Sequence, residues 1–121
     1  MNLLAENHQV ITFLSNNESL ISGKLRSVLI YYDGKELCID LRIELMYSDK
    51  HKNILLRFNG VLEYALYYTS DSSFYNIERY VFIEEKKIFY LSLDPVDEQA
   101  IFRDNNDNDY ILSKSIFLYE S

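Results

Sequence analysis

The chain has 121 residues and a mass of 14.4 kDa, which suits one compact domain with a single core. Apolar residues make up 48% of it and charged residues 26%, which excludes a disordered chain, and three glycines and one proline exclude collagen-like or linker-like architectures. The formal net charge is −7 and the basic residues form no stripe, which argues against nucleic-acid binding.

The compartment can also be predicted from composition. No stretch reaches the roughly 18 consecutive apolar residues of a membrane span, and the first residues lack the basic region and long apolar run of a signal peptide. A single cysteine, Cys38, cannot form an internal disulfide. We therefore expect a cytoplasmic protein with no membrane association.

The N-terminal segment has apolar residues at helical spacing between Leu3 and Leu14, with Asn2 as a candidate N-cap. The polar run at residues 15–18 is typical of a break. We predict a short helix and its break within residues 1–18, ahead of the main sheet.

From Gly23 onward the apolar period changes to two, which predicts antiparallel hairpins over residues 19–93. Asp33-Gly34 separates the first two strands and favours a type I′ turn. The second strand alternates strictly, so we expect Leu37, Ile39, Leu41, Ile43 and Leu45 on the core and Glu36, Cys38, Asp40, Arg42 and Glu44 in water.

The later strands are less sharply bounded. Asn59-Gly60 favours a hairpin between residues 54–58 and 61–69, and the alternative is a glycine bulge in one long bent strand. Residues 76–84 and 88–93 flank a charged connection, and Asp94-Pro95 ends the second of them. An acidic loop at 94–109, with a helical turn around residues 96–102, precedes the C-terminal strand at 110–121.

The predicted fold class is therefore α+β, mainly β. It consists of an antiparallel meander of six or seven strands with a short N-terminal helix. The sheet is either single or curled into a sandwich-like shape. Eleven tyrosines fit cross-strand packing on such a sheet, and some could instead anchor a protein partner.

Negative charge is concentrated in the acidic loop, which holds six acids and one base, Arg103. One interpretation is a solvated loop that maintains solubility. The other is a surface that steers the protein toward a basic partner. The partner-binding residues in that hypothesis are the acids Asp94, Asp97, Glu98, Asp104, Asp107 and Asp109, with Tyr110 as an anchor.

Catalysis and metal binding find little support in the residue pattern. The two histidines, His8 and His51, and Cys38 are widely separated, and the run 104–109 lacks the glycine and closing glutamate of an EF-hand. Asp71 with Glu84 and Lys86 nominally fits a nuclease-like metal set, which leaves a metal-dependent hydrolase as an alternative. We expect no catalytic residue, no metal and no cofactor.

Three blocks carry a resemblance to a known family. They are Leu25-x-x-Val28-x-Ile30 with Asp33-Gly34 and Leu37-x-Ile39-x-Leu41, then Ile54-x-Leu56-x-Phe58-x-Gly60-Val61, then Tyr90-Leu91-Ser92-Leu93-Asp94-Pro95-Val96-Asp97-Glu98. From Ser19 onward the chain resembles the immunity protein fifty-like family of bacterial polymorphic-toxin systems.

The resemblance implies a non-enzymatic protein that binds and occludes a co-encoded toxin, and it supplies no catalytic residues. A basic nuclease would suit the acidic loop, which could occupy its phosphate-binding cleft. The chain would then be a monomer or a weak homodimer. The alternative from another class is an interaction or homo-oligomerising β module unrelated to toxins.

Overall fold

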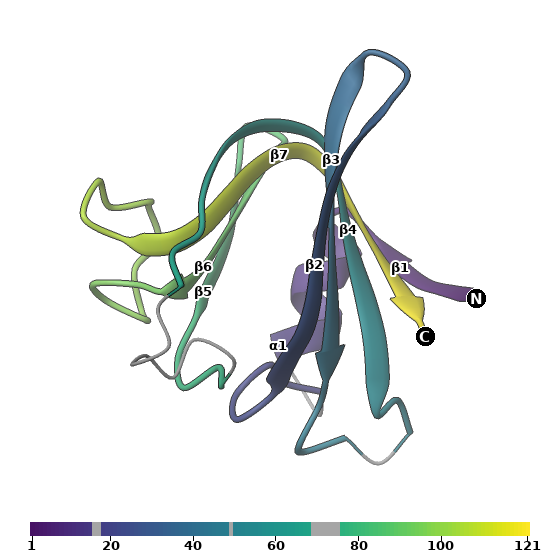
Figure 1. The fold of residues 1–121 in the computed structure, drawn as a ribbon. Coiled ribbons are helices and arrows are strands. Elements are labelled where there is room, and N and C mark those ends of the chain that lie inside the picture. The colour runs from purple at the N-terminus through teal and green to yellow at the C-terminus, as the bar shows by residue number, and fades with distance from the viewer. Residues whose placement is uncertain (16–17, 49, 69–75) are drawn as a thin grey trace.

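A computed structural model describes residues 1–15, 18–48, 50–68 and 76–121 of the chain, and within these ranges it contains seven strands and one helix (Figure 1). In chain order the elements are β1 (Asn2–Glu6), α1 (His8–Ser15), β2 (Lys24–Asp33), β3 (Glu36–Glu44), β4 (Asn53–Ala65), β5 (Val81–Glu85), β6 (Ile88–Asp94) and β7 (Asn108–Glu120).

All seven strands form one antiparallel sheet in the order β2-β3-β4-β7-β6-β5, and β1 also pairs with β7. The strand β7 pairs with β4 along most of its length, with β6 through residues 108–113 and with β1 through residues 117–120. The sheet curves along β4 and β7, so that the β5–β6 hairpin lies apart from β2 and β3 (Figure 1). The predicted mainly β, α+β fold with a short N-terminal helix is confirmed.

The core lies on the concave side of this sheet. The predicted alternation in β3 places Ile39 opposite Phe58 and Leu41 opposite Leu56, and all four side chains are buried. The helix α1 adds Val10 and Leu14 to the same cluster. Each fully buried side chain of this kind contributes about 1.5–3 kcal/mol relative to an exposed one.

The N-terminal prediction is partly wrong, because the first residues form β1 and the helix begins only at His8. Asn7 lies between them with φ +53°, which the helix cannot accommodate. Its backbone N–H donates to the Ile116 carbonyl at 2.7 Å, and its side-chain oxygen accepts from the Ile116 N–H at 3.1 Å. Pairing with β7 therefore overrides the helical spacing of the apolar residues.

The β2–β3 hairpin is confirmed, but its turn differs from the predicted one. Asp33 pairs with Glu36, so the two turn residues are Gly34 and Lys35. Only Gly34 of these has a positive φ, +69°. This pattern fits a type II′ turn, which places glycine at the first central position, and the predicted type I′ turn is wrong.

The predicted hairpin at Asn59-Gly60 is wrong, and the alternative of a bulge in one long strand is correct. β4 runs without interruption from Asn53 to Ala65, and its register against β7 shifts between Val61 and Glu63. Gly60 has φ +66°, so it supplies the conformation that lets the strand bend.

The connection between β5 and β6 is the shortest type of hairpin turn. Lys86 and Lys87 have φ values of +53° and +63°, as a type I′ turn requires, and β6 ends at Asp94 before Pro95 as predicted. The strand β5 starts later than expected, at Val81. Among the described residues no helix is long and apolar enough to cross a membrane.

Candidate functional site

The loop between β6 and β7, residues 95–107, is built around the buried side chain of Asp107. Its Oδ2 accepts a hydrogen bond from the Tyr90 hydroxyl at 2.6 Å and one from the Asp104 N–H at 3.1 Å, and its Oδ1 accepts one from the Val96 N–H at 2.8 Å. Three donors therefore converge on one carboxylate: one from β6 and one from near each end of the loop. This arrangement fixes the path of the loop.

The same contacts shift the pKa values of Asp107 and Tyr90. Burial alone raises the pKa of Asp107, but the hydrogen bonds from Tyr90, Val96 and Asp104 outweigh it and leave the pKa below its ordinary value. Burial and the bond to the Asp107 carboxylate raise the pKa of Tyr90. At neutral pH the pair is thus a charged carboxylate and a protonated phenol.

Shorter turns complete the loop. The Asp104 carboxylate accepts from the Asn106 N–H at 2.8 Å, and the Asp97 carboxylate accepts from the Gln99 N–H at 2.9 Å. The predicted helical turn around residues 96–102 is absent from this described segment, where a single bond from the Ala100 N–H to the Asp97 carbonyl, at 3.1 Å, closes one turn. Aspartate side chains here replace helical hydrogen bonds.

Arg103, the one base of the acidic loop, lies over two aromatic rings and against an acid. Its guanidinium carbon is 5.3 Å from the Tyr90 ring centroid and 5.2 Å from that of Tyr110, and its Nη2 is 3.2 Å from a Glu63 carboxylate oxygen. The Tyr110 hydroxyl donates to the same carboxylate. These two donors lower the pKa of Glu63, and the bond to Glu63 raises that of Tyr110.

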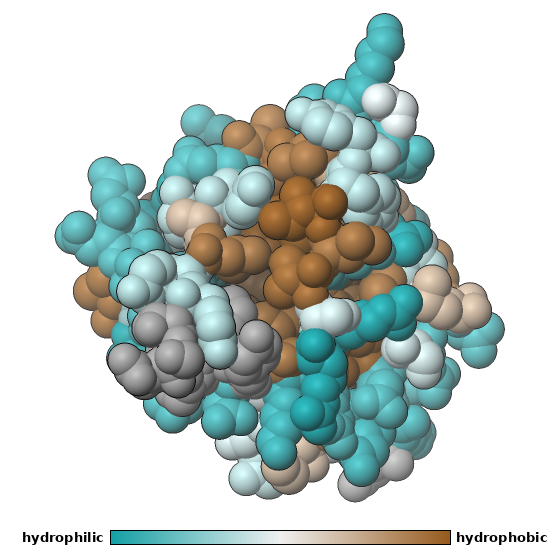
Figure 2. All heavy atoms as spheres, viewed as in Figure 1, coloured by the Kyte–Doolittle hydropathy of each residue, from teal (hydrophilic) through white to brown (hydrophobic). Residues whose placement is uncertain are grey.

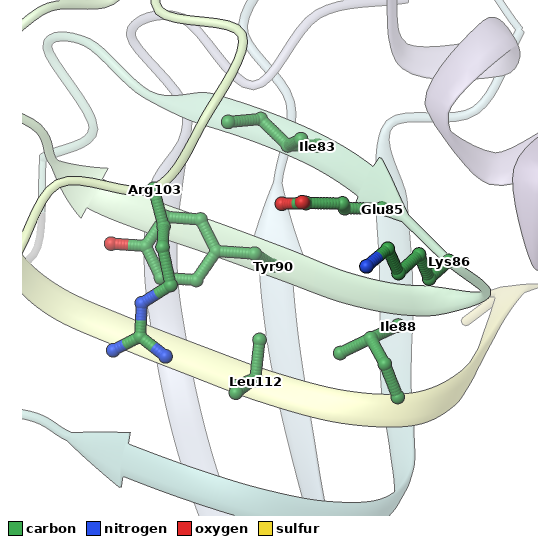
Figure 3. A pocket seen from close by; sticks show the side chains of 7 residues that line it. All are labelled: Ile83, Glu85, Lys86, Ile88, Tyr90, Arg103 and Leu112. Carbon is green, nitrogen blue, oxygen red and sulfur yellow. The ribbon is translucent and has the colours of Figure 1, made fainter.

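An apolar cavity of about 220 Å³ lies beside this cluster (Figure 3). Ile83, Ile88 and Leu112 line it from three adjacent strands, with the Tyr90 ring and Arg103 at one end. The polar rim at the other end comes from Glu85, the last residue of β5, and from Lys86 of the β5–β6 turn. A cavity of this size and lining suits one apolar side chain of a partner.

The predicted partner-binding residues divide into three groups. Asp94, Asp97 and Glu98 are exposed, so their charges face solvent. Asp107 is only 6% exposed, which corrects the expectation that it adds surface charge. The remaining three are half-buried and take part in internal contacts; these are Asp104, Asp109 and Tyr110.

Asp109 has a distinct structural role at the start of β7. It adopts φ +48°, and its carboxylate accepts a hydrogen bond from the Tyr67 N–H at 2.8 Å. Burial raises its pKa. It therefore joins the end of β4 to the acidic loop, and presents less charge to solvent than the sequence indicates.

Three large apolar side chains of the same loop are exposed, and sequence reasoning missed them. Val96 is 54% exposed, Ile101 74% and Phe102 62%. Their presence in a loop otherwise rich in acids, without strand or helix periodicity, could have indicated this exposure. We use the name loop surface for the exposed residues Asp94, Val96, Asp97, Glu98, Ile101 and Phe102.

The polar face predicted for β3 is also partly buried. Cys38 and Asp40 are 2% and 6% exposed, contrary to the expectation that this face lies in water. Asp40 accepts two hydrogen bonds of 3.0 Å from Arg57 and one of 3.1 Å from the Tyr31 hydroxyl. Burial raises the pKa of the Cys38 thiol, which makes it a poorer nucleophile.

The nominal metal set does not assemble within the described residues. Glu84 binds the His8 ring nitrogen at 2.8 Å, whereas the neighbouring Glu85 and Lys86 line the apolar cavity. Asp71 lies outside the described residues. In the described part of the chain no group of three His, Cys, Asp or Glu side chains could hold a metal ion.

Comparisons with protein-family models, with curated proteins and with solved structures find no significant match to this chain.

Proposed function

We propose that this protein binds and occludes a basic toxin domain of a bacterial polymorphic-toxin system through the loop surface, without catalysing a reaction. The observation that carries the proposal is the convergence of three donors on Asp107. A loop fixed in this way loses little conformational entropy on binding, which favours affinity. The sequence resemblance to immunity proteins points to the same class of partner.

The exposed negative charges increase the rate at which the protein encounters a basic partner. Asp94, Asp97 and Glu98 are exposed on a molecule of net charge −7. Such a surface accelerates encounter with a basic partner and fits a cleft that normally holds phosphates. Rim charges of this kind act mainly on the association rate.

Apolar contacts determine how slowly the complex dissociates. Ile101 and Phe102 are exposed next to the acids and can enter pockets of the partner, as hot-spot residues do. Tyr110 contributes less than expected from sequence, because its hydroxyl is already bonded to Glu63. We expect Phe102 to govern dissociation.

The test is co-expression with the toxin domain encoded beside this chain. An equimolar complex should form and protect the cells from the toxin. The double variant Asp97→Asn/Glu98→Gln should associate about tenfold more slowly at low salt, with a shallower salt dependence. Phe102→Ala should dissociate about tenfold faster with little change in association.

The matched control neutralises two exposed acids on strands that do not contact the loop, Glu6→Gln on β1 and Glu36→Gln on β3. It removes the same formal charge and should bind like the wild type. Equal association rates and salt slopes for the loop variant and the control would place the interface elsewhere. Failure of the adjacent toxin domain to bind would refute the proposed function itself.

A further inference from the structure

The outer edge of β2 is the longest free strand edge in the described part of the chain. β2 pairs with β3 on one side, and on the other side its first residue, Lys24, forms an isolated bridge with Asn76. From Ser27 to Asp33 no described residue pairs with this edge. The other edge strands, β1 and β5, have only five residues each.

This edge carries apolar side chains on both faces of the sheet. Val28, Ile30 and Tyr32 share a face with the core residues of β3 but are 36%, 41% and 74% exposed. Leu29 lies on the opposite face and is 57% exposed. Figure 2, in the same view as Figure 1, shows hydrophobic residues gathered in the middle of the molecule, where β2 runs.

Natural edge strands usually carry protection against pairing with another chain. The common devices are lysine, proline, a bulge or a very short strand. The segment from Ser27 to Asp33 contains neither lysine nor proline, and the bulge of β2 lies before it, between Leu25 and Ser27. The edge is therefore competent for strand addition.

The order of residues along the edge is self-complementary about Ile30. If a second copy pairs antiparallel with Ile30 opposite Ile30, then Val28 faces Tyr32, Leu29 faces Tyr31 and Ser27 faces Asp33. Every such pair joins residues of the same face, as a two-fold axis normal to the sheet requires. The paired segment also ends before Lys24, where Asn76 occupies the edge.

Charge at the two ends of the segment agrees with this register. Arg26 stands at the start of the segment with its side chain 58% exposed, beside Glu44, and Asp33 stands at the other end. Arg26 and Asp33 lie toward the same face, because Asp33 aligns with Glu36 and Arg26 contacts Glu44. Antiparallel pairing brings Arg26 of each copy close to Asp33 of the other.

We propose that a second copy of this chain docks on β2, pairing its own β2 antiparallel in the register centred on Ile30. The two sheets then become one continuous sheet, and two Arg26–Asp33 pairs flank an apolar centre. This inference is independent of the loop surface and of the toxin hypothesis.

Sedimentation velocity over a series of protein concentrations tests the proposal. The wild type should show a monomer–dimer equilibrium. Ile30→Lys places two ammonium groups opposite each other at the axis and should keep the protein monomeric. Ile101→Lys makes the same substitution, with the same charge change, on the loop surface and should leave the dimer intact.

A charge exchange tests the register without adding any charge to the apolar centre. Arg26→Glu and Asp33→Lys should each raise the dissociation constant about tenfold, because each homodimer then has two like-charge pairs. An equimolar mixture of the two variants should recover dimers, since both cross pairs are then of opposite charge. Circular dichroism establishes that each variant is folded.

Several results would overturn the proposal. One is a monomeric wild type at the highest concentration, and another is a dimer that Ile30→Lys leaves unchanged. A mixture no more associated than its separate components would contradict the register. A dimer weakened by Ile101→Lys would place the contact on the loop surface instead.

Discussion

Two buried carboxylates, Asp40 and Asp107, are satisfied in different ways. Asp40 forms a two-pronged ion pair with Arg57, whose guanidinium carbon also lies 5.2 Å from the Tyr119 ring centroid. Asp107 contacts a phenol and two backbone amides instead. A buried charge without partners destabilises the folded state. We therefore expect substitution of either aspartate to change the stability of the protein in a specific way.

Asp40→Ala should lower the free energy of unfolding by about 2–3 kcal/mol, because Arg57 and Tyr31 lose their common acceptor. Urea denaturation measures this loss. The double variant Asp40→Ala/Arg57→Ala should lose less than the sum of the two single variants. As a control, Glu44→Ala removes the acceptor of the exposed Arg26 ion pair and should change the free energy of unfolding little. If the losses of Asp40→Ala and Arg57→Ala simply add in the double variant, the assigned contact between the two side chains is wrong.

The pH dependence of stability should report on Asp107. Its pKa is lower in the folded than in the unfolded state, so it stabilises the fold above its unfolded pKa of about 3.9. That contribution is lost as pH falls through the folded pKa. Denaturation from neutral pH to about pH 3 should show a smaller loss for Asp107→Asn than for the wild type. Parallel curves of stability against pH for the two proteins would contradict this assignment. The pKa of Asp109 is raised, so its contribution to stability changes with pH in the opposite direction.

At the scale of elements, the bend in β4 depends on Gly60. An added Cβ would stand 2.5 Å from a Glu36 carboxylate oxygen and 3.2 Å from the Lys114 Cβ, and φ +66° strains any other residue. Gly34 has a similar φ, +69°, but no atom within 4 Å of such a Cβ.

Gly60→Ala should therefore cost more stability than Gly34→Ala. Strain alone accounts for about 1 kcal/mol in each variant, and crowding adds about 1 kcal/mol at Gly60. Thermal unfolding of the two variants gives the comparison. Adding Glu36→Ala to Gly60→Ala should recover part of the lost stability. Equal losses of stability for Gly60→Ala and Gly34→Ala would show that the bulge at Gly60 is not crowded.

The same two elements show what could be predicted from sequence. The alternation in β3 determined its register and core face, because a one-residue slip would expose every apolar side chain. Asn59-Gly60 suits a turn and a bulge equally well locally, and only pairing of β4 with β7 decides between them. Leu3 and Leu4 likewise fit a helix until the edge of β7, more than 100 residues later, is available to pair with them.

The contacts within the acidic loop could not be predicted from the sequence. Six acids in one segment mark this loop as strongly charged, and its role in binding a partner stays a prediction. Which of them face solvent depends on the path of the chain, and Asp107 is buried only because Tyr90 and the amides of Val96 and Asp104 surround it. Composition does not encode such contacts between separate elements.

At the scale of the whole molecule, β7 is the strand on which the fold depends. It pairs with β1, β4 and β6, and so joins the first and last segments of the chain to the middle ones. Contacts between residues so distant in sequence slow folding, because loop closure precedes any stabilising contact. The pairing of Asn2 with Glu120 also places the two termini side by side (Figure 1).

Adjacent termini allow a circular permutation that tests this architecture. A short turn should join Ser121 to Asn2, and new termini placed between Lys86 and Lys87 interrupt only a two-residue connection. That permutant should fold, with a melting temperature within about 10 °C of the wild type. The control opens the chain between Gly60 and Val61, inside the strand that pairs with both β3 and β7, and should unfold at a much lower temperature. Similar melting temperatures for the two permutants would show that continuity of β4 is not what holds the two halves of the sheet together.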